Sequence, residues 1–316
     1  MIEARGLART FRTRRGPVEA VRGVDLSVAP GEIVGFLGPN GAGKTTTLRM
    51  LTTLLDPTAG SATVAGCDLR ADPAGVRLRI GYVAQDGGTD QSARVMEELL
   101  LQADLYRIES HEGQKRAEQL CVQLELSGLE SRLVKTLSGG QKRRLDIALG
   151  LVHHPPLVFL DEPTAGLDPH SRGNMWEHIR RLRKDLNTTI FLTTHYLEEA
   201  DALCDRILII DHGKIVAQGT PDELKRRISG DVVTVETSDP TAAKNALANR
   251  EGVRDTAIAD GTLRLTVDHG EKVILTILRA LDAAGVNLAA IRVARPSLDD
   301  VFLTVTGRSL REETEK

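Results

Sequence analysis

Up to about residue 225, the chain alternates between short apolar segments and longer segments with a helical pattern. The apolar segments cover residues 32–37, 80–83, 157–160, 188–193 and 207–211, and they have the length and β-branched content of buried strands. Strands that are buried on both faces form continuous apolar runs, which are typical of a parallel sheet covered by helices. The pattern therefore predicts an α/β fold for this part of the chain.

The segments between these strands have a helical pattern. The stretch over residues 93–127 differs from its strand-rich flanks, and it predicts a helical subdomain at about residues 86–136. Further helices are predicted over residues 44–54, 139–153 and 173–185.

Around residue 228 the pattern changes, and Ser229-Gly230 has the composition of a linker. The strand-like segments that follow are 232–236, 253–258, 263–267 and 288–293, and the helical segments are 241–248 and 271–284. The resulting order, β-α-β-β-α-β, is that of a small ferredoxin-like α+β domain. We therefore expect a first domain over residues 1–228, a second over 229–307 and a flexible tail over 308–316.

Composition narrows the function classes. The 316 residues have room for two domains, and a formal net charge of −3 gives no electrostatic reason to expect a nucleic-acid partner. No apolar run approaches the roughly 18 residues of a membrane span, and the N-terminus lacks the apolar core of a secretory signal. Three distant cysteines without a CxxC pair offer neither a disulfide framework nor a zinc site, and they fit a reducing cytosol.

A glycine-rich turn joins the first apolar strand to the helix that follows it. Its residues match the phosphate-binding pattern GxxxxGK[ST]: Gly38, Pro39, Asn40, Gly41, Ala42, Gly43, Lys44 and Thr45. The glycines allow backbone N–H groups to surround phosphate oxygens, and the helix N-terminus adds its positive end. Lys44 would reach the β- and γ-phosphates and Thr45 would bind Mg²⁺. A turn that only caps a helix is the alternative, but the strand–turn–helix context favours a site for ATP or GTP.

Two carboxylates follow the apolar strand at residues 157–160. A strand that ends in Asp161 places a carboxylate at the sheet edge, where a P-loop enzyme holds Mg²⁺. Glu162 is then placed to polarise the water that attacks the γ-phosphate. Solvated acids at a strand end are the alternative interpretation, and the nearby P-loop argues against it.

A second anion-binding turn precedes the predicted helix at residues 139–153. Its Ser138, Gly139, Gly140 and Gln141 form a helix cap that resembles the P-loop without its lysine. Its position before Asp161, together with the P-loop, resembles the signature of the ATP-binding-cassette (ABC) ATPases. This resemblance covers residues 1 to about 225.

Other positions match the motifs of this family one by one. Gln85 matches the Q-loop glutamine, which senses Mg²⁺ and the attacking water, and Asp168 matches the D-loop aspartate that faces a partner subunit. His195 matches the switch histidine that contacts the γ-phosphate, and Thr46 follows the P-loop threonine among the expected nucleotide contacts. Phe11 stands where the family commonly has a tyrosine that stacks on adenine. An ordinary core phenylalanine is the alternative for Phe11.

The resemblance implies a head-to-tail homodimer that uses ATP and Mg²⁺. Each ATP would lie between Lys44 of one subunit and the 138–141 turn of the other, and the chain holds one copy of each motif. Two chains are therefore needed for two sites. Binding of ATP would close the pair, and hydrolysis would open it.

The family also contains non-transport members. In the DNA-repair members a long coiled coil separates the P-loop from the signature, and the gap between Thr45 and Leu137 is too short for one. A regulator without catalysis would be expected to lack Glu162 or His195. A transport ATPase is therefore favoured, in which the helical region after Gln85 docks a membrane permease on another chain.

The C-terminal ending points to a subgroup. Residues 295–303 read Arg-Pro-Ser-Leu-Asp-Asp-Val-Phe-Leu, which resembles the ending of ATPases that serve ABC-2-type exporters, especially the daunorubicin/doxorubicin-resistance group. This implies export of an anthracycline-type drug through an integral-membrane ABC-2-type permease, with the chain peripheral on the cytoplasmic face of the cell membrane. Export of a lipid, polysaccharide or ion is the alternative, and an amphipathic helix packed on its own domain is compatible with the segment 298–303.

Overall fold

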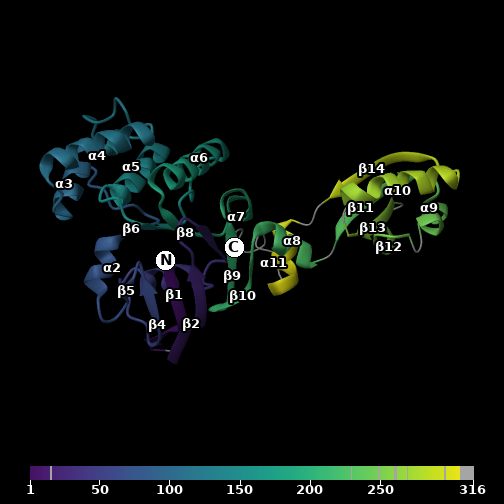
Figure 1. Cartoon of the computed structure of the whole chain (residues 1–316), viewed down its shortest axis with the longest axis horizontal. Helices are drawn as coiled ribbons and strands as arrows, with labels where there is room; N and C mark the ends of the chain where they lie inside the picture. Colours follow the sequence, from purple (N-terminus) through teal and green to yellow (C-terminus); the bar gives the residue numbers. More distant parts are fainter. Residues whose placement is uncertain are drawn as a thin grey trace. The chain divides into compact units, whose positions relative to one another are not determined.

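The computed structural model describes residues 1–14, 16–228, 230–247, 250–259, 262–268, 270–294 and 297–306. The chain forms two compact units, Met1–Gln218 and Gly219–Lys316 (Figure 1). The predicted linker residue Ser229, the first two residues of the segment 295–303 and the predicted tail 308–316 lie outside the described residues. Within the described part of the chain, every helix is too short or too polar to cross a membrane.

A six-stranded, largely parallel sheet forms the centre of the first unit, as the apolar pattern predicts. Its order is β10(Lys214–Gly219), β9(Arg206–Asp211), β3(Ile33–Leu37), β8(Thr189–Thr194), β7(Leu157–Asp161) and β6(Ile80–Val83). The pairs β3–β8, β3–β9, β6–β7 and β7–β8 are parallel. Phe191 lies with its ring centroid 5.6 Å from those of Phe36 and Phe159, so the aromatic residues of three adjacent strands pack together. The carboxyl ends of these strands carry the candidate site.

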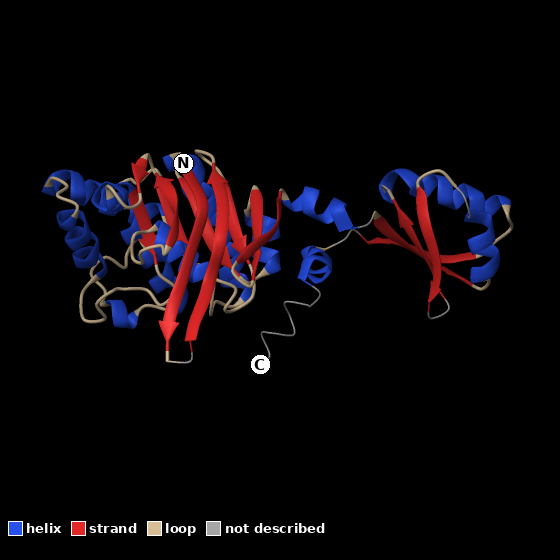
Figure 2. Cartoon of the chain, turned by 90° about the horizontal axis from the view of Figure 1, so that it is seen from below, coloured by secondary structure: helices blue, strands red, loops and turns tan. Residues whose placement is uncertain are grey.

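A second, four-stranded sheet was not predicted from the sequence. Its order is β2(Gly16–Val28), β1(Ile2–Thr13), β4(Ala59–Val64) and β5(Cys67–Asp68), with antiparallel pairing throughout. Figure 2 shows these strands in red. A Cβ on Gly60 would lie 2.2 Å from the carbonyl oxygen of Gly6, so the close approach of β4 to β1 requires glycine there. Buried residues of this sheet, including Ile2 and Leu7, share one core with Phe36 of the parallel sheet.

Helices complete the first unit. They are α1(Lys44–Leu51), α2(Pro73–Arg79), α3(Val95–Leu105), α4(Ser110–Gln123), η1(Val134–Thr136), α5(Gly139–Leu151), α6(Pro169–Leu186) and α7(Leu197–Leu203). The predicted helical stretch 93–127 is thus two helices, α3 and α4, which contact each other and α5. The apolar pattern does not predict the shorter helix α2, which buries only Val76.

The second unit contains the predicted β-α-β-β-α-β order. Its elements are α8(Pro221–Ile228), β11(Asp231–Thr237), α9(Pro240–Leu247), β12(Val253–Ala259), β13(Thr262–Val267), α10(Gly270–Ala283), β14(Leu288–Ala294) and α11(Leu298–Thr306). The sheet order is β12-β13-β11-β14, and every pair is antiparallel. Ile277 and Leu281 of α10 pack on Val233, Val235 and Leu265 of the sheet. The fold class, a P-loop α/β cassette followed by a ferredoxin-like α+β domain, is confirmed.

The second unit begins at Gly219, earlier than the boundary expected at residue 228. The reason is that α8 packs against α11, the last helix, and therefore belongs with the second unit. Leu224 of α8 is buried, as are Val301 and Phe302 of α11. This packing also agrees with the expectation of an amphipathic helix at residues 298–303.

Candidate nucleotide site

The glycine-rich turn after β3 has the geometry of a phosphate cradle. Gly41 and Gly43 have φ angles of 79° and 109°, which side chains other than glycine rarely tolerate. A Cβ on Gly43 would lie 2.6 Å from the Ala20 carbonyl oxygen, and one on Gly38 would lie 2.3 Å from that of Ile210. Gly43 is also the N-cap of α1, so the turn leads directly into a helix N-terminus. Gly38, Gly41 and Gly43 thus fix the shape of the loop, because a side chain at any of them would clash with a neighbour or strain the backbone.

Lys44 lies inside this turn and is only 4% exposed. Its Nζ donates hydrogen bonds to the carbonyl oxygens of Gly38 at 2.7 Å and Pro39 at 3.1 Å. It also lies 3.4 Å from Oε1 of Glu162. Burial lowers the pKa of Lys44, although the carboxylates of Glu162 and Asp161 oppose the shift. The ammonium group is therefore held where it can bind phosphate oxygens in the loop.

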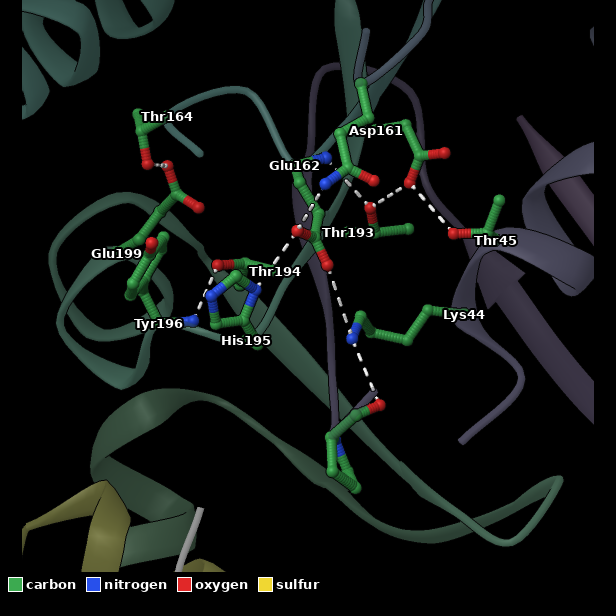
Figure 3. A network of polar contacts seen from close by, with 12 residues as sticks. Lys44, Thr45, Asp161, Glu162, Thr164, Thr193, Thr194, His195, Tyr196 and Glu199 are labelled. Atoms are coloured by element: carbon green, nitrogen blue, oxygen red, sulfur yellow. Dashed lines mark hydrogen bonds and ion pairs between the residues drawn. The ribbon is translucent and has the colours of Figure 1, made fainter. Parts of the chain in front are cut away.

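Oxygen atoms at the end of β7 form a candidate magnesium site (Figure 3). Thr45 Oγ1 lies 3.4 Å from Oδ1 of Asp161, and Thr193 Oγ1 donates to the same oxygen at 2.6 Å. Burial raises the pKa of the Asp161 carboxyl, against the hydrogen bond from Thr193, and a bound cation would compensate this burial. Hydroxyl and carboxylate oxygens suit Mg²⁺, which keeps few protein ligands and binds substrate phosphates. Gln85 would supply its amide oxygen.

In the part of the chain that the structure describes, no three or more His, Cys, Asp and Glu side chains gather in a metal-binding cluster. A single carboxylate with hydroxyl and amide oxygens fits a magnesium ion held jointly with a nucleotide. The donor set does not resemble a zinc site, which would use cysteine or histidine.

Glu162 is the centre of the polar network in Figure 3 and is 7% exposed. Its carboxylate contacts Lys44, accepts a hydrogen bond from Gln85 Nε2 at 3.3 Å, and lies 3.1 Å from His195 Nδ1. Burial would raise the pKa of Glu162, but His195 and Lys44 together hold it below its ordinary value. Its backbone has φ 47° and its N–H donates to Thr193 Oγ1 at 3.0 Å. Glu162 is thus an ionised carboxylate, ready to accept a proton.

The predicted catalytic residues come together from separate elements. Lys44 and Thr45 begin α1, Gln85 follows β6, Glu162 follows β7 and His195 follows β8. The parallel strands end at the same edge of the sheet, so residues distant in the sequence converge there.

The signature turn begins α5. Ser138 Oγ accepts from the Gln141 N–H at 3.3 Å, and the Gln141 side chain accepts from the Ser138 N–H at 2.9 Å, so the two form a capping box. A Cβ on Gly139 would meet no atom within 4 Å, and one on Gly140 would meet only Ser171 Oγ at 4.0 Å. Among the described residues no hydrogen bond or ion pair joins this turn to the P-loop. Among the described residues, no close contact at Gly139 or Gly140 requires glycine, and this fits a surface kept open for a ligand that another subunit brings.

No hydrogen bond or ion pair among the described residues joins Asp168 or Phe11 to the polar network around Glu162. Asp168 is the N-cap of α6 and accepts hydrogen bonds from Ser171, from N at 3.0 Å and from Oγ at 2.6 Å. Phe11 is half-buried on β1 and does not belong to the core cluster that contains Phe36. The Arg9 guanidinium lies 4.8 Å from its ring centroid. A cation therefore lies over one face of the Phe11 ring.

Replacing Phe11 by alanine is expected to weaken ATP binding about tenfold, because stacking of a base on an aromatic ring contributes about 1–3 kcal/mol. Binding of a fluorescent ATP analogue, measured by anisotropy, tests this. Phe11→Tyr is the matched control and should bind as tightly as the native chain. An alanine variant with native affinity would exclude Phe11 from the adenine site.

Sequence reasoning missed two residues that organise the site. Thr193 joins the carboxylate of Asp161 to the backbone of Glu162. Arg143 of α5 is buried, and its guanidinium donates to the carbonyl oxygens of Asp161 at 2.8 Å, Pro163 at 2.9 Å and Ala84 at 2.5 Å. The signature helix is thereby tied to the strand ends. In the sequence, Arg143 stands between Lys142 and Arg144, so nothing distinguishes it from its charged neighbours or reveals its distant partners.

Comparisons with known proteins agree with this geometry. Residues 21–165 match the family model "ABC transporter", and residues 219–306 match "ATP-binding protein DrrA1-3-like, C-terminal domain". The doxorubicin resistance ATP-binding protein DrrA of Mycobacterium tuberculosis (strain CDC 1551 / Oshkosh) is 42% identical, over 95% of this chain and 92% of its own. The chain belongs to the ABC transporter ATPases. The daunorubicin resistance ATP-binding protein DrrA2 of Streptomyces coeruleorubidus is 40% identical to this ABC ATPase, over 95% and 94% of the two chains.

A solved structure supports the same conclusion. The ATP-binding cassette MJ0796, in a dimeric post-hydrolysis state bound to ADP and Pi, is 25% identical and matches with a TM-score of 0.64. The match covers 70% of this ABC ATPase and 98% of that chain. The protein is thus an ATPase that uses ATP with Mg²⁺, and its C-terminal domain is of the DrrA-like type.

Proposed function

We propose that this ABC ATPase powers the export of an anthracycline-type antibiotic through a separate, integral-membrane permease of the ABC-2 type. The observation that carries this proposal is the similarity to drug-resistance ATP-binding proteins, which extends through the cassette and the C-terminal domain. The chain would act as a homodimer, peripheral on the cytoplasmic face of the cell membrane. We also propose a domain boundary near the start of α8, with the helical subdomain between Gln85 and the signature.

The site suggests how hydrolysis proceeds. Glu162 accepts a proton from the attacking water. Gln85 and His195 both contact the Glu162 carboxylate and hold this carboxylate in place. When ATP binds, Lys44 would leave Glu162 for the phosphate oxygens, and Mg²⁺ held by Thr45 and Asp161 would supply positive charge that offsets the charge of the phosphates. The Ser138 turn and Asp168 of the second subunit complete the site. Loss of the γ-phosphate removes contacts from both subunits, so the pair opens.

A cavity beside β6 is suited to hold a segment of the permease. Its volume is about 240 Å³ and it lies between α2, β6 and α3, with Leu54, Arg77, Tyr82 and Tyr106 in its walls. Leu54 is an exposed apolar residue. Because Gln85 follows β6 closely, a segment that binds here would touch the strand that leads to this proposed catalytic residue. Movement of the permease and occupancy of the nucleotide site would therefore be coupled.

Co-expression with the candidate permease tests the transport proposal. The chain should sediment with membranes only when the permease is present, and cells with both should accumulate less daunorubicin than cells with a Glu162→Gln chain. Membrane attachment without any effect on daunorubicin would instead favour a lipid, polysaccharide or ion as cargo. A chain that never attaches to membranes would contradict the transport role.

The cavity beside β6 is tested by Leu54→Asp, which places a charge in its wall. We expect membrane attachment to fall about tenfold or more, since an unpaired charge in an apolar contact costs at least about 1.4 kcal/mol. Val122→Asp on α4 is the control, because both side chains are exposed apolar residues, 57% and 69% exposed, and both changes add one charge. ATP binding by each purified variant checks its folding. Equal attachment of the two variants would place the permease elsewhere.

A further inference from the structure

A buried carboxyl group that is not among the predicted site residues lies between the segments that carry those residues. Glu199 of α7 is 1% exposed, and its Oε1 accepts hydrogen bonds from Thr164 Oγ1 at 2.8 Å and from Trp176 Nε1 at 3.2 Å. Burial raises the pKa of Glu199, against the hydrogen bonds from Thr164 and Trp176. An apolar side chain of similar size would fit this place without the cost of burying a polar group. The polar contacts are therefore the feature to explain.

The contacts of Glu199 connect three different parts of the site. Thr164, which is labelled beside Glu199 in Figure 3, lies between Glu162 and the D-loop, residues 165–168. Trp176 is on α6, whose N-cap is the D-loop residue Asp168. Glu199 itself is on α7, whose N-cap Tyr196 directly follows His195. One side chain thus connects the residue before the D-loop, the helix that the D-loop begins, and the segment that carries the switch histidine.

A second connection runs between the same segments at the surface. Arg172 Nε donates to the Leu167 carbonyl oxygen of the D-loop at 3.1 Å. Its guanidinium lies 4.3 Å from the centroid of the Tyr196 ring, and that ring lies 4.0 Å from the ring of His195. The D-loop and His195 are therefore also linked through Arg172 and Tyr196.

We propose that Glu199 is a positioning residue that couples the placement of the D-loop to that of His195. It acts through its hydrogen bonds with Thr164 and Trp176 and through α7, which begins two residues after His195. Contact of the D-loop with a second subunit would then fix His195 against the γ-phosphate, so that hydrolysis follows dimer closure. The inference rests on the roles proposed above for Asp168 and His195.

Trp176 makes this coupling measurable, because it is the only tryptophan in the chain. Its indole N–H bonds directly to Glu199, and its fluorescence should respond when ATP and Mg²⁺ close the dimer. Three variants separate the contacts. Glu199→Leu removes the acceptor, Thr164→Val removes one donor with little change of shape, and Glu199→Gln keeps an acceptor oxygen.

We expect kcat for ATP to fall at least about tenfold in Glu199→Leu and Thr164→Val, because misplaced catalytic groups cost rate. The KM should stay within about threefold, since no nucleotide contact is lost. The ATP-dependent change in Trp176 fluorescence should disappear in both, and Glu199→Gln should restore most of the rate and the signal. Leu182→Ala on α6 is the control for a simple loss of packing, and it should lower the melting temperature while keeping the fluorescence response.

Native kcat and a native fluorescence response in Thr164→Val would overturn the proposal, even if Glu199→Leu fails to fold. A glutamine variant as slow as the leucine variant would also contradict it. Glu162→Gln measured in parallel distinguishes a failure of the proposed base from a failure of the proposed coupling. If that variant hydrolyses ATP normally, the proposed base is wrong; if it is inactive while the Glu199 and Thr164 variants are native-like, only the coupling is wrong.

Discussion

Glu162→Gln should lower the rate of ATP hydrolysis by about 10²–10⁴-fold, the usual contribution of a positioned general base. The amide has the shape of the carboxylate but cannot accept a proton from water. The contacts with Gln85 and His195 tolerate a neutral side chain, so ATP binding should survive. The variant should therefore accumulate as an ATP-bound dimer.

Phosphate release measures the rate, and sedimentation with and without ATP and Mg²⁺ measures the dimer. Glu177→Gln, at an exposed position on α6, is the control for loss of one carboxylate. It should hydrolyse ATP at the native rate and should not accumulate as a dimer. A Glu162→Gln chain that stays monomeric and hydrolyses ATP normally would exclude Glu162 as the base.

Lys44→Ala should raise the Kd for ATP at least about 100-fold. Hydrogen bonds to charged groups contribute about 1.5–3 kcal/mol each, and a factor of ten corresponds to 1.4 kcal/mol. The change also leaves the buried carboxylate of Glu162 without the cation that lies 3.4 Å away, which adds repulsion toward the γ-phosphate.

Titration calorimetry with a non-hydrolysable ATP analogue measures this loss. Lys184→Ala, which removes an exposed lysine from the last turn of α6, should bind the analogue as the native chain does. Native affinity in Lys44→Ala would contradict the assignment of the 38–45 turn as the phosphate cradle.

The parts of the fold that the sequence predicts are those fixed by contiguous residues. The turn at 38–45 holds its phosphate-binding groups within one loop, and β3, β7 and β8 are fully buried. In the sequence β3 and β7 appear as apolar runs, and β8 appears as Ile190, Phe191 and Leu192 between threonines. The convergence of Gln85, Glu162 and His195 follows from the parallel arrangement of their strands. The ferredoxin-like order was readable because alternating strands and amphipathic helices are local patterns.

Long-range features were not readable in the same way. Strands β1 and β2 are largely exposed and their register shifts three times, which obscures the period of two. The packing of α8 on α11 joins segments at opposite ends of the second unit. For this reason the second unit begins at Gly219 and includes α8. Thr193 and Glu199 act through hydrogen bonds to residues more than 20 positions away. A polar residue in a strand or helix does not by itself indicate such a partner.

The most direct test of the shared nucleotide site is a mixture of two defective chains, both carrying Glu162→Gln to prevent hydrolysis. One also carries Lys44→Ala and the other Ser138→Glu, which brings a negative charge toward the γ-phosphate. Neither chain alone should form an ATP-bound dimer.

If each ATP lies between Lys44 of one subunit and Ser138 of the other, a mixed dimer has one intact site. The mixture should therefore form dimers that each retain one ATP, as measured by sedimentation and nucleotide content. A mixture that forms no ATP-bound dimer, while the parent Glu162→Gln chain does, would contradict a site shared between two subunits.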